Sequence, residues 1–115
     1  MANRWEIPQE IELRLKQAFR LCAYCGKKMR SHAGILGCPQ DKATFEHLNR
    51  HGPFRWSDGL REEHLVIACA QCNSSRGRKL LSEWFMSEYC IARGISPTTV
   101  AAQVKRYLRT TAARR

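Results

Sequence analysis

Two cysteine pairs carry the clearest chemical signal in the sequence. They are Cys22-x-x-Cys25 and Cys69-x-x-Cys72, with residues 26–68 between them. A CxxC turn directs two thiolates toward one point, so two such turns can complete a tetrahedral Cys₄ shell around Zn²⁺. Such a shell has no open coordination position, and we therefore expect a structural zinc that takes no part in chemistry. A redox-active dithiol protein, which would hold no zinc, is the alternative reading of the same spacing.

The other two cysteines fall outside this pattern. Cys90 lies in an apolar stretch with helical spacing, which predicts a small buried side chain. Cys38 follows His32 by six residues, but two isolated candidate ligands in a loop do not define a metal site.

The segment between the cysteine pairs supplies groups of a different kind. Glu46 and His47 are neighbours in an expected strand, where alternation places them on opposite faces. Asn73 follows a predicted zinc ligand directly, at the start of an expected helix. Carboxylate and amide oxygens suit Mg²⁺ or Mn²⁺, and an uncharged imidazole nearby can take a proton from water. These residues are therefore candidates for a site of metal-assisted hydrolysis; the alternative reading is a surface Glu-His dipeptide and an Asn that caps the helix.

These residues also resemble a known family. The run Phe45-Glu46-His47, followed by the stretch from His64 to Lys79, is similar to HNH endonucleases of the four-cysteine type. That family shows CxxC, then an acid–His pair, then Asn-Leu-x-x-x-Cys-x-x-Cys-(Asn/His)-x-x-Lys-Gly. The resemblance covers about residues 22–79 and implies a ββα-metal core, in which a divalent ion lies between a β-hairpin and a helix.

Transferred to this sequence, the family pattern gives each position a role. His47 would be the general base, and Glu46 and Asn73 would hold Mg²⁺ or another divalent ion. His64 stands where the family has its middle Asn, a residue that braces the hairpin and orients the base. The resemblance further implies hydrolysis of DNA phosphodiester bonds to 5′-phosphate and 3′-hydroxyl ends, with the four paired cysteines as zinc ligands.

The sequence departs from the family pattern in places. Glu46 replaces the commoner Asp, and Arg76-Gly77 replaces Lys-Gly. Glu63-His64 is a second acid–His pair, but it lies too close to Cys69 to leave room for a hairpin, so Glu46-His47 is preferred. Asn49 and His51 lie just beyond His47, where they could contact substrate or metal, but their position beside Gly52-Pro53 favours an interpretation as turn residues.

Local patterns predict the elements that position these groups. We expect an α+β fold in which a small ββα core with its Cys₄ site is flanked by N- and C-terminal helices. It would form a single domain, with its core at about residues 20–80 and a basic helical extension at about 81–115. The first predicted element is a helix that begins near Pro8 and turns Ile11 and Leu15 inward, and it is followed by strands at 43–48 and 64–69. A helix is expected after Cys72, and an apolar helical stripe runs from Leu81 to Tyr89 and ends before Gly94. Ser96-Pro97 should begin a last helix, which turns Val100, Val104 and Leu108 inward.

The charge indicates a polyanionic partner. In 115 residues, 20 Lys and Arg stand against 10 Asp and Glu, a formal net charge of +10. The charge predicts a nucleic acid, and the HNH resemblance implies that this partner is DNA. Two groups of basic residues are candidates for contact with phosphates, although a solvated surface is the simpler reading of the second: Arg76, Arg78 and Lys79; Lys105, Arg106 and Arg109.

Other classes are less compatible with the sequence. No apolar run approaches the roughly 18 residues that cross a bilayer, and the first residues lack a secretory pattern, which predicts a cytoplasmic protein. Small proteins of the family it resembles occur widely in phages and mobile elements. The chain could nick DNA as a monomer, whereas a double-strand cut would call for a homodimer. A zinc-stabilised DNA-binding module without catalysis is the alternative function.

Overall fold

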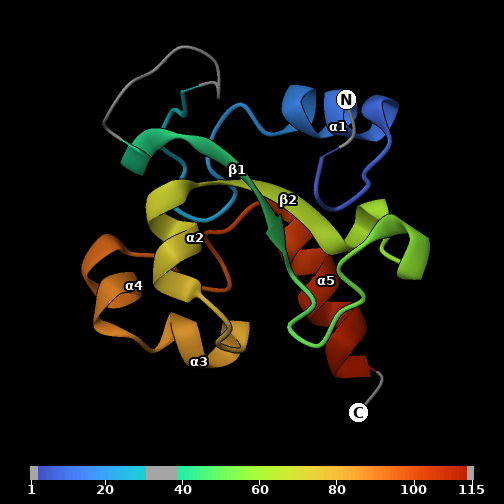
Figure 1. Cartoon of the computed structure of the whole chain (residues 1–115). Helices are drawn as coiled ribbons and strands as arrows, with labels where there is room; N and C mark the ends of the chain where they lie inside the picture. The colour runs from blue at the N-terminus through green and yellow to red at the C-terminus, as the bar shows by residue number, and fades with distance from the viewer. Residues whose placement is uncertain (1–2, 31–38, 114–115) are drawn as a thin grey trace.

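A two-stranded antiparallel sheet lies at the centre of the fold, between helices on both faces (Figure 1). The computed structural model describes residues 3–30 and 39–113. Strands β1 (Ala43–His47) and β2 (Leu65–Cys69) pair in the register Ala43↔Cys69 to His47↔Leu65. Helix α2 (Ala70–Arg76) follows β2 directly and packs on both strands. The predicted α+β class is therefore confirmed, and both strands lie within the ranges 43–48 and 64–69 in which the sequence predicts them.

Strand β2 is buried along its whole length and divides the core into two clusters. Val66 and Ala68 pack into a cluster with Trp84, on the side of α2. Leu65 and Ile67 pack into a second cluster with residues of the N-terminal segment. Each fully buried aliphatic side chain contributes about 1.5–3 kcal/mol, so β2 is fixed from both faces and its register is strongly specified.

The N-terminal helix covers the second cluster. Helix α1 (Gln9–Ala18) turns Ile11 and Leu15 inward, as their spacing predicts, and Pro8 precedes its first residue. The chain then leaves the helix at Phe19 and turns at residues 22–25, where the first cysteine pair lies. In the described ranges, three short 3₁₀ segments occupy the connections: Pro39–Asp41, Trp56–Asp58 and Glu62–His64.

The C-terminal part differs from the sequence prediction at two points. The stripe from Leu81 to Tyr89 forms two helices, α3 (Leu81–Phe85) and α4 (Glu88–Arg93). They separate because Ser87 caps α4, its Oγ accepting a hydrogen bond from the Cys90 amide at 3.3 Å. Gly94 ends α4 in the left-handed conformation, as predicted.

The last helix also begins later than predicted. Helix α5 (Ala102–Ala113) starts six residues after Ser96, because side-chain hydroxyls in this segment bond to local backbone groups instead. The amide of Ala101 donates to the carbonyl of Ala23 at 2.8 Å and ties this segment to the first cysteine turn. Val100 and Val104 are buried, as their spacing predicts.

Candidate functional site

The four paired cysteines converge at one point of the structure. Cys22 and Cys25 lie in the turn after α1, Cys69 ends β2 and Cys72 lies in the first turn of α2. Their Sγ atoms all lie within 4.8 Å of one another, and those of Cys25 and Cys69 are 3.9 Å apart. Zn–S bonds of about 2.3 Å in a tetrahedron place sulfurs roughly 3.8 Å apart, so this set fits a zinc ion.

Backbone amides support this cysteine arrangement. The Sγ of Cys22 accepts hydrogen bonds from the amides of Tyr24 at 3.5 Å and Cys69 at 3.3 Å, and the Sγ of Cys69 accepts from the Cys72 amide at 3.4 Å. Hydrogen bonds from the thiols of Cys69 and Cys72 hold the pKa of Cys22 well below its usual value. The cluster therefore favours a thiolate, the form that binds a metal.

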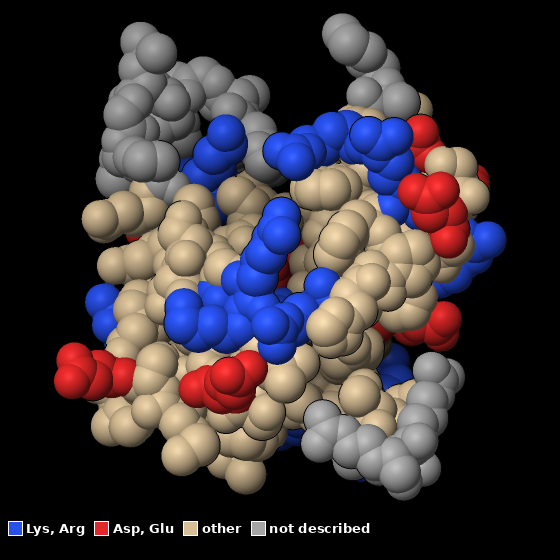
Figure 2. All heavy atoms as spheres, turned by 60° about the horizontal axis from the view of Figure 1, so that its bottom comes forward, with Lys and Arg blue, Asp and Glu red and all other residues tan. Residues whose placement is uncertain are grey.

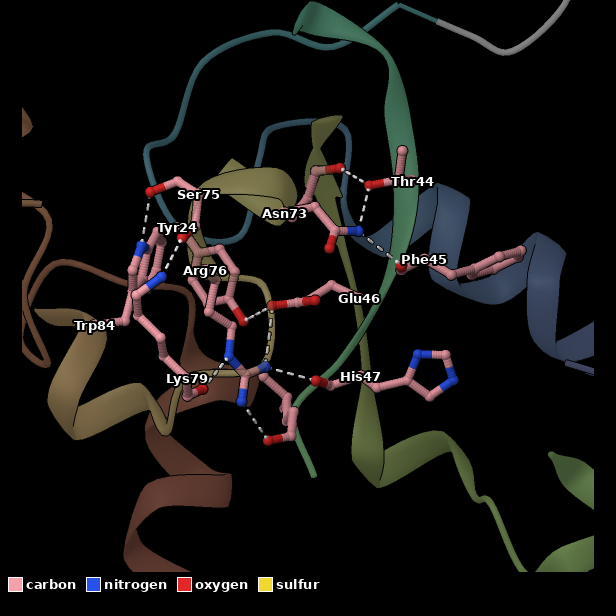
Figure 3. A network of polar contacts seen from close by, with 12 residues as sticks. Tyr24, Thr44, Phe45, Glu46, His47, Asn73, Ser75, Arg76, Lys79 and Trp84 are labelled. Atoms are coloured by element: carbon pink, nitrogen blue, oxygen red, sulfur yellow. Dashed lines mark hydrogen bonds and ion pairs between the residues drawn. The ribbon is translucent and has the colours of Figure 1, made fainter. Parts of the chain in front are cut away.

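The two sides of β1 carry different chemistry, as strand alternation predicts. Glu46 points toward Tyr24 and Arg76, whereas the ring of His47 points to the opposite side of the strand (Figure 3). Asn73, from α2, lies on the same side of β1 as Glu46 (Figure 3). The structure therefore groups the two predicted metal ligands on one side and leaves the predicted base on the other.

Glu46 is buried and already paired. The hydroxyl of Tyr24 donates to its Oε2 at 2.6 Å, and Nη1 of Arg76 lies 3.1 Å from the same oxygen. Loss of solvent raises the pKa of Glu46, while the positive charge of Arg76 and the Tyr24 hydroxyl act in the opposite direction. The carboxylate is therefore held in place before any ion binds.

Arg76 lies inside the protein, whereas the sequence predicts that it contacts phosphate at the surface. Only 2% of it is exposed. Its guanidinium donates to the carbonyls of His47 at 2.6 Å, Leu48 at 3.1 Å and Lys79 at 2.9 Å, in addition to Glu46. Arg76 therefore fixes the end of β1 against α2, and its charge serves Glu46 instead of an external phosphate.

Asn73 connects α2 to β1. Its Nδ2 donates to Thr44 Oγ1 at 2.9 Å and to the carbonyl of Phe45 at 3.0 Å. No donor from the described part of the chain hydrogen-bonds to Asn73 Oδ1 or to Glu46 Oε1. A carboxylate oxygen and an amide oxygen are ligand types that a divalent ion such as Mg²⁺ takes, together with water and phosphate.

His47 is held between aromatic rings at the end of β1. Its ring centroid lies 4.4 Å from that of Trp5 and 5.6 Å from that of Phe54, both in edge-to-face geometry. Its Nε2 lies 3.2 Å from the carbonyl oxygen of Phe54. Burial lowers the pKa of His47, which favours the uncharged ring at neutral pH.

His64 contacts the chain next to His47 through its backbone. Its carbonyl accepts from the amide of Leu48 at 2.8 Å, and its Nδ1 accepts from the amide of Arg61 at 3.0 Å. The carbonyl that orients the His47 ring comes from Phe54, a residue that the sequence did not indicate. His64 thus braces the loop after β1 through its backbone, and the hydrogen bond of its ring is with Arg61 instead of with the His47 ring.

The remaining polar residues of this loop hold its shape. The amide of Gly52 donates to the carbonyl of Asn49 at 3.1 Å, and Asn49 Nδ2 donates to the carbonyl of Pro53 at 2.8 Å. His51 is exposed, as is Glu63, the acid of the rival acid–His pair. The interpretation of Asn49 and His51 as turn residues is consistent with these contacts.

The other predicted DNA contacts lie at the surface. Arg78, Lys79, Arg106 and Arg109 are exposed, and Lys105 is half-buried. Lys and Arg side chains gather across the face that lies at the bottom of Figure 1, with Asp and Glu toward its edges (Figure 2). A surface of this kind attracts polyanions.

The two cysteines outside the cluster differ in whether the structure describes them. Cys90 is fully buried in the core, as predicted. Cys38 and His32 lie outside the described residues.

Sequence reasoning missed the partners of the site residues. Tyr24 lies within the first CxxC turn, and Trp5 and Phe54 lie 42 and 7 residues from His47 in the chain. No periodicity links these residues to Glu46 or His47, because their contacts arise from tertiary packing. The sequence offered one signal for these partners, which is that aromatic residues stand next to basic residues.

No helix within the described ranges is long and apolar enough to cross a bilayer. No family model matches the chain, and no curated protein or solved structure matches it.

Proposed function

We propose that this protein is a metal-dependent DNA endonuclease that hydrolyses phosphodiester bonds with His47 as general base. The observation that carries the proposal is the arrangement around β1. Glu46 and Asn73 offer two oxygens on one side of the strand, while the next residue, His47, has its ring oriented by a carbonyl. The HNH resemblance of the same residues and the net charge of +10 support it further.

The tautomer of His47 follows from its hydrogen bond. The carbonyl oxygen of Phe54 can only accept, so Nε2 carries the proton and Nδ1 carries the lone pair. The lowered pKa keeps this lone pair available at neutral pH. His47 Nδ1 would take a proton from the water that attacks phosphorus, a contribution of about 10²–10⁴ in rate.

Glu46 and Asn73 would hold the catalytic divalent ion through Oε1 and Oδ1. When bound, such an ion neutralises charge on the phosphate and stabilises the leaving oxygen. Arg76 restrains Glu46, and its positive charge weakens the attraction of the carboxylate for a cation. The site would therefore bind Mg²⁺ weakly in the free protein and more strongly once a phosphate supplies further negative charge.

The exposed basic residues would hold the DNA backbone. Arg78 and Lys79 follow α2 directly, at the end of the helix that carries Asn73. Arg106 and Arg109 are exposed on α5. Several phosphate contacts make binding fall steeply with salt, whatever the sequence of the DNA.

One observation favours a second candidate, a zinc-stabilised DNA-binding module without catalysis. The Glu46 carboxylate already has a buried cationic partner and needs no metal to balance its charge. In that case the Glu46–Arg76 pair would serve the fold alone.

Plasmid cleavage by the zinc-loaded protein separates the two candidates. The assay compares the wild type, His47→Ala and His51→Ala in Mg²⁺ or Mn²⁺; His51 is an exposed histidine of the same loop and serves as the matched control. We expect cleavage by the wild type and His51→Ala, and a loss of about 10²-fold or more in His47→Ala. Equal cleavage by wild type and His47→Ala would exclude His47 as the base. DNA binding without cleavage by any variant would favour the binding module.

A further inference from the structure

The residues that flank His47 form an aromatic surface that the proposed chemistry does not require. Of the aromatic residues in the described part of the chain, only Phe54 is exposed, at 42%. Trp5 is half-buried and also packs edge-to-face on the His47 ring. The exposed face of the phenyl ring buries no apolar area in the folded protein, so it is available to bind a ligand.

Both rings are mounted on backbone that is already fixed. The amide of Trp5 donates to Asn3 Oδ1 at 3.0 Å, and the carbonyl of Trp5 accepts from the amide of Trp56 at 2.9 Å. The segment before Phe54 is held by the Asn49 side chain at Pro53, 2.8 Å away. A ligand that stacks on these rings would therefore lose little free energy in ordering them.

The charge around the rings indicates what kind of ligand fits. The guanidinium of Arg4 lies 4.2 Å from the centroid of the Trp5 ring, and Arg55, next to Phe54, is exposed. The nearest acids along the chain are Glu6, beside Trp5, and Asp58, four residues after Phe54; the Glu6 carboxylate accepts from the amide of Ser57 at 3.2 Å. The exposed ring of Phe54, with guanidinium groups at Arg4 and Arg55, matches a ligand with flat rings and phosphates, as a nucleic acid strand has.

We propose that Phe54 and Trp5, the two aromatic rings that pack on His47, form a stacking platform for an unpaired nucleobase of DNA, next to the phosphate that the water activated by His47 attacks. In a duplex, both faces of each base are covered by neighbouring base pairs. Only a base in a single strand, a gap or a frayed end can therefore lie on these rings. The platform would give single-stranded or locally unpaired DNA an advantage over duplex DNA. The placement beside the attacked phosphate rests on the proposed function, whereas stacking itself needs no cleavage.

Binding without an added divalent ion tests the platform separately from catalysis. The probes are a fluorescein-labelled mixed-sequence strand of about 12 nucleotides, within the span that such sites cover, and the same strand in a duplex. Anisotropy gives the Kd of the zinc-loaded protein for each probe at one fixed salt concentration. For Phe54→Ala we expect the single-strand Kd to rise about 5- to 100-fold, the loss of one stacked base, with the duplex Kd changed less than about twofold.

Substitutions that change one property at a time sharpen the test. Phe54→Trp keeps an aromatic face and should keep single-strand binding, whereas Phe54→Leu keeps apolar area and should lose it. Ile91→Ala removes an exposed apolar side chain on α4, 70% exposed, and should change neither Kd. A Phe54→Ala protein that binds single strands as the wild type does, or loses both probes equally, would overturn the platform. So would a wild type that binds neither probe.

The outcomes keep the platform and the nuclease proposal distinguishable. Single-strand binding that depends on Phe54, with no cleavage in Mg²⁺ or Mn²⁺, would keep the platform and overturn the nuclease. Cleavage that depends on His47, with binding unaffected by Phe54→Ala, would keep the nuclease and overturn the platform.

Discussion

The cysteine cluster and the Glu46–Asn73 pair are two candidate metal centres that differ in how their ligands are used. The four sulfurs face one another, and backbone amides already donate to two of them. Glu46 instead gives one oxygen to Tyr24 and Arg76, and Asn73 gives its amide nitrogen to β1. The first centre is closed and complete without a partner. The second offers two oxygens and needs water or a phosphate to complete it.

The difference teaches what each centre does for the chain. A closed thiolate shell joins the turn after α1 to the β2–α2 junction and thereby holds the hairpin and helix together. The half-open oxygen pair depends on that framework, because Asn73 directly follows Cys72. Metal loss at the first centre should therefore abolish the fold, and changes at the second should alter stability less and activity more.

The largest effect should follow loss of a zinc ligand. Cys69→Ser replaces a sulfur near the sulfurs of its three partners, and structural zinc contributes about 10–16 kcal/mol to folding in small zinc domains. We expect a protein that lacks stoichiometric zinc and does not unfold cooperatively, measured by elemental analysis and circular dichroism. Cys90→Ala, which alters a buried cysteine outside the cluster, should keep its zinc. A Cys69→Ser protein with full zinc content and wild-type unfolding would contradict the structural role.

Breaking the buried ion pair should have the next largest effect. Glu46→Ala leaves the Arg76 guanidinium buried without its carboxylate, which costs about 3–5 kcal/mol of unfolding free energy. Urea denaturation at fixed zinc content measures the loss. Glu46→Gln keeps an acceptor for Tyr24 and Arg76 and should cost less. If Glu46→Ala proved as stable as the wild type, the pair would not anchor β1.

Asn73 should matter moderately for stability. Asn73→Ala removes two hydrogen bonds to β1, and the orphaned carbonyl of Phe45 makes a loss of about 1–3 kcal/mol the expected result. The same change should raise the Mg²⁺ concentration needed for half-maximal cleavage. Ser74→Ala, at an exposed position on the same helix, is the control and should leave both quantities unchanged. An unaltered Mg²⁺ requirement in Asn73→Ala would remove Asn73 from the ion site.

The smallest expected effect is a displaced pH profile. Burial lowers the pKa of His47 from the ordinary value of 6.5, so the ring stays uncharged to a lower pH than a free histidine does. Activity should therefore persist as the pH falls toward 6.5 and decline only below it. The acid limb of kcat/KM, measured at saturating zinc, checks this. An acid limb centred above pH 6.5 would show that burial does not determine the pKa of His47 in the active protein.

The sequence predicted the local features well. Cysteine spacing predicted the cluster, a β-branched apolar run predicted the strand at 64–69, and 43–48 was the best strand candidate in its loop-rich segment, because each signal lies within a few neighbouring residues. Strand alternation was enough to separate Glu46 from His47. The sequence did not predict that α4 starts after Ser87 or that α5 starts at Ala102, because side-chain hydroxyls compete with helical hydrogen bonds near both starts.

The long-range partners of the site could not be predicted. Arg76 looked like a surface residue beside Arg78 and Lys79, yet the packing of α2 against β1 turns it inward. The carbonyl that orients His47 belongs to Phe54, and only the folded loop brings it there. Such contacts depend on tertiary structure that no local pattern encodes.

The Mg²⁺ dependence of DNA cleavage, at one zinc per chain, tests the central claim most directly. The rate is measured for the wild type and His47→Ala over increasing Mg²⁺, with zinc content checked before and after. Two separate centres with His47 as base predict a wild-type rate that rises from zero and saturates at constant zinc, with His47→Ala slower by about 10²-fold or more throughout. A wild-type rate that does not respond to Mg²⁺, or that His47→Ala reproduces, would contradict the account.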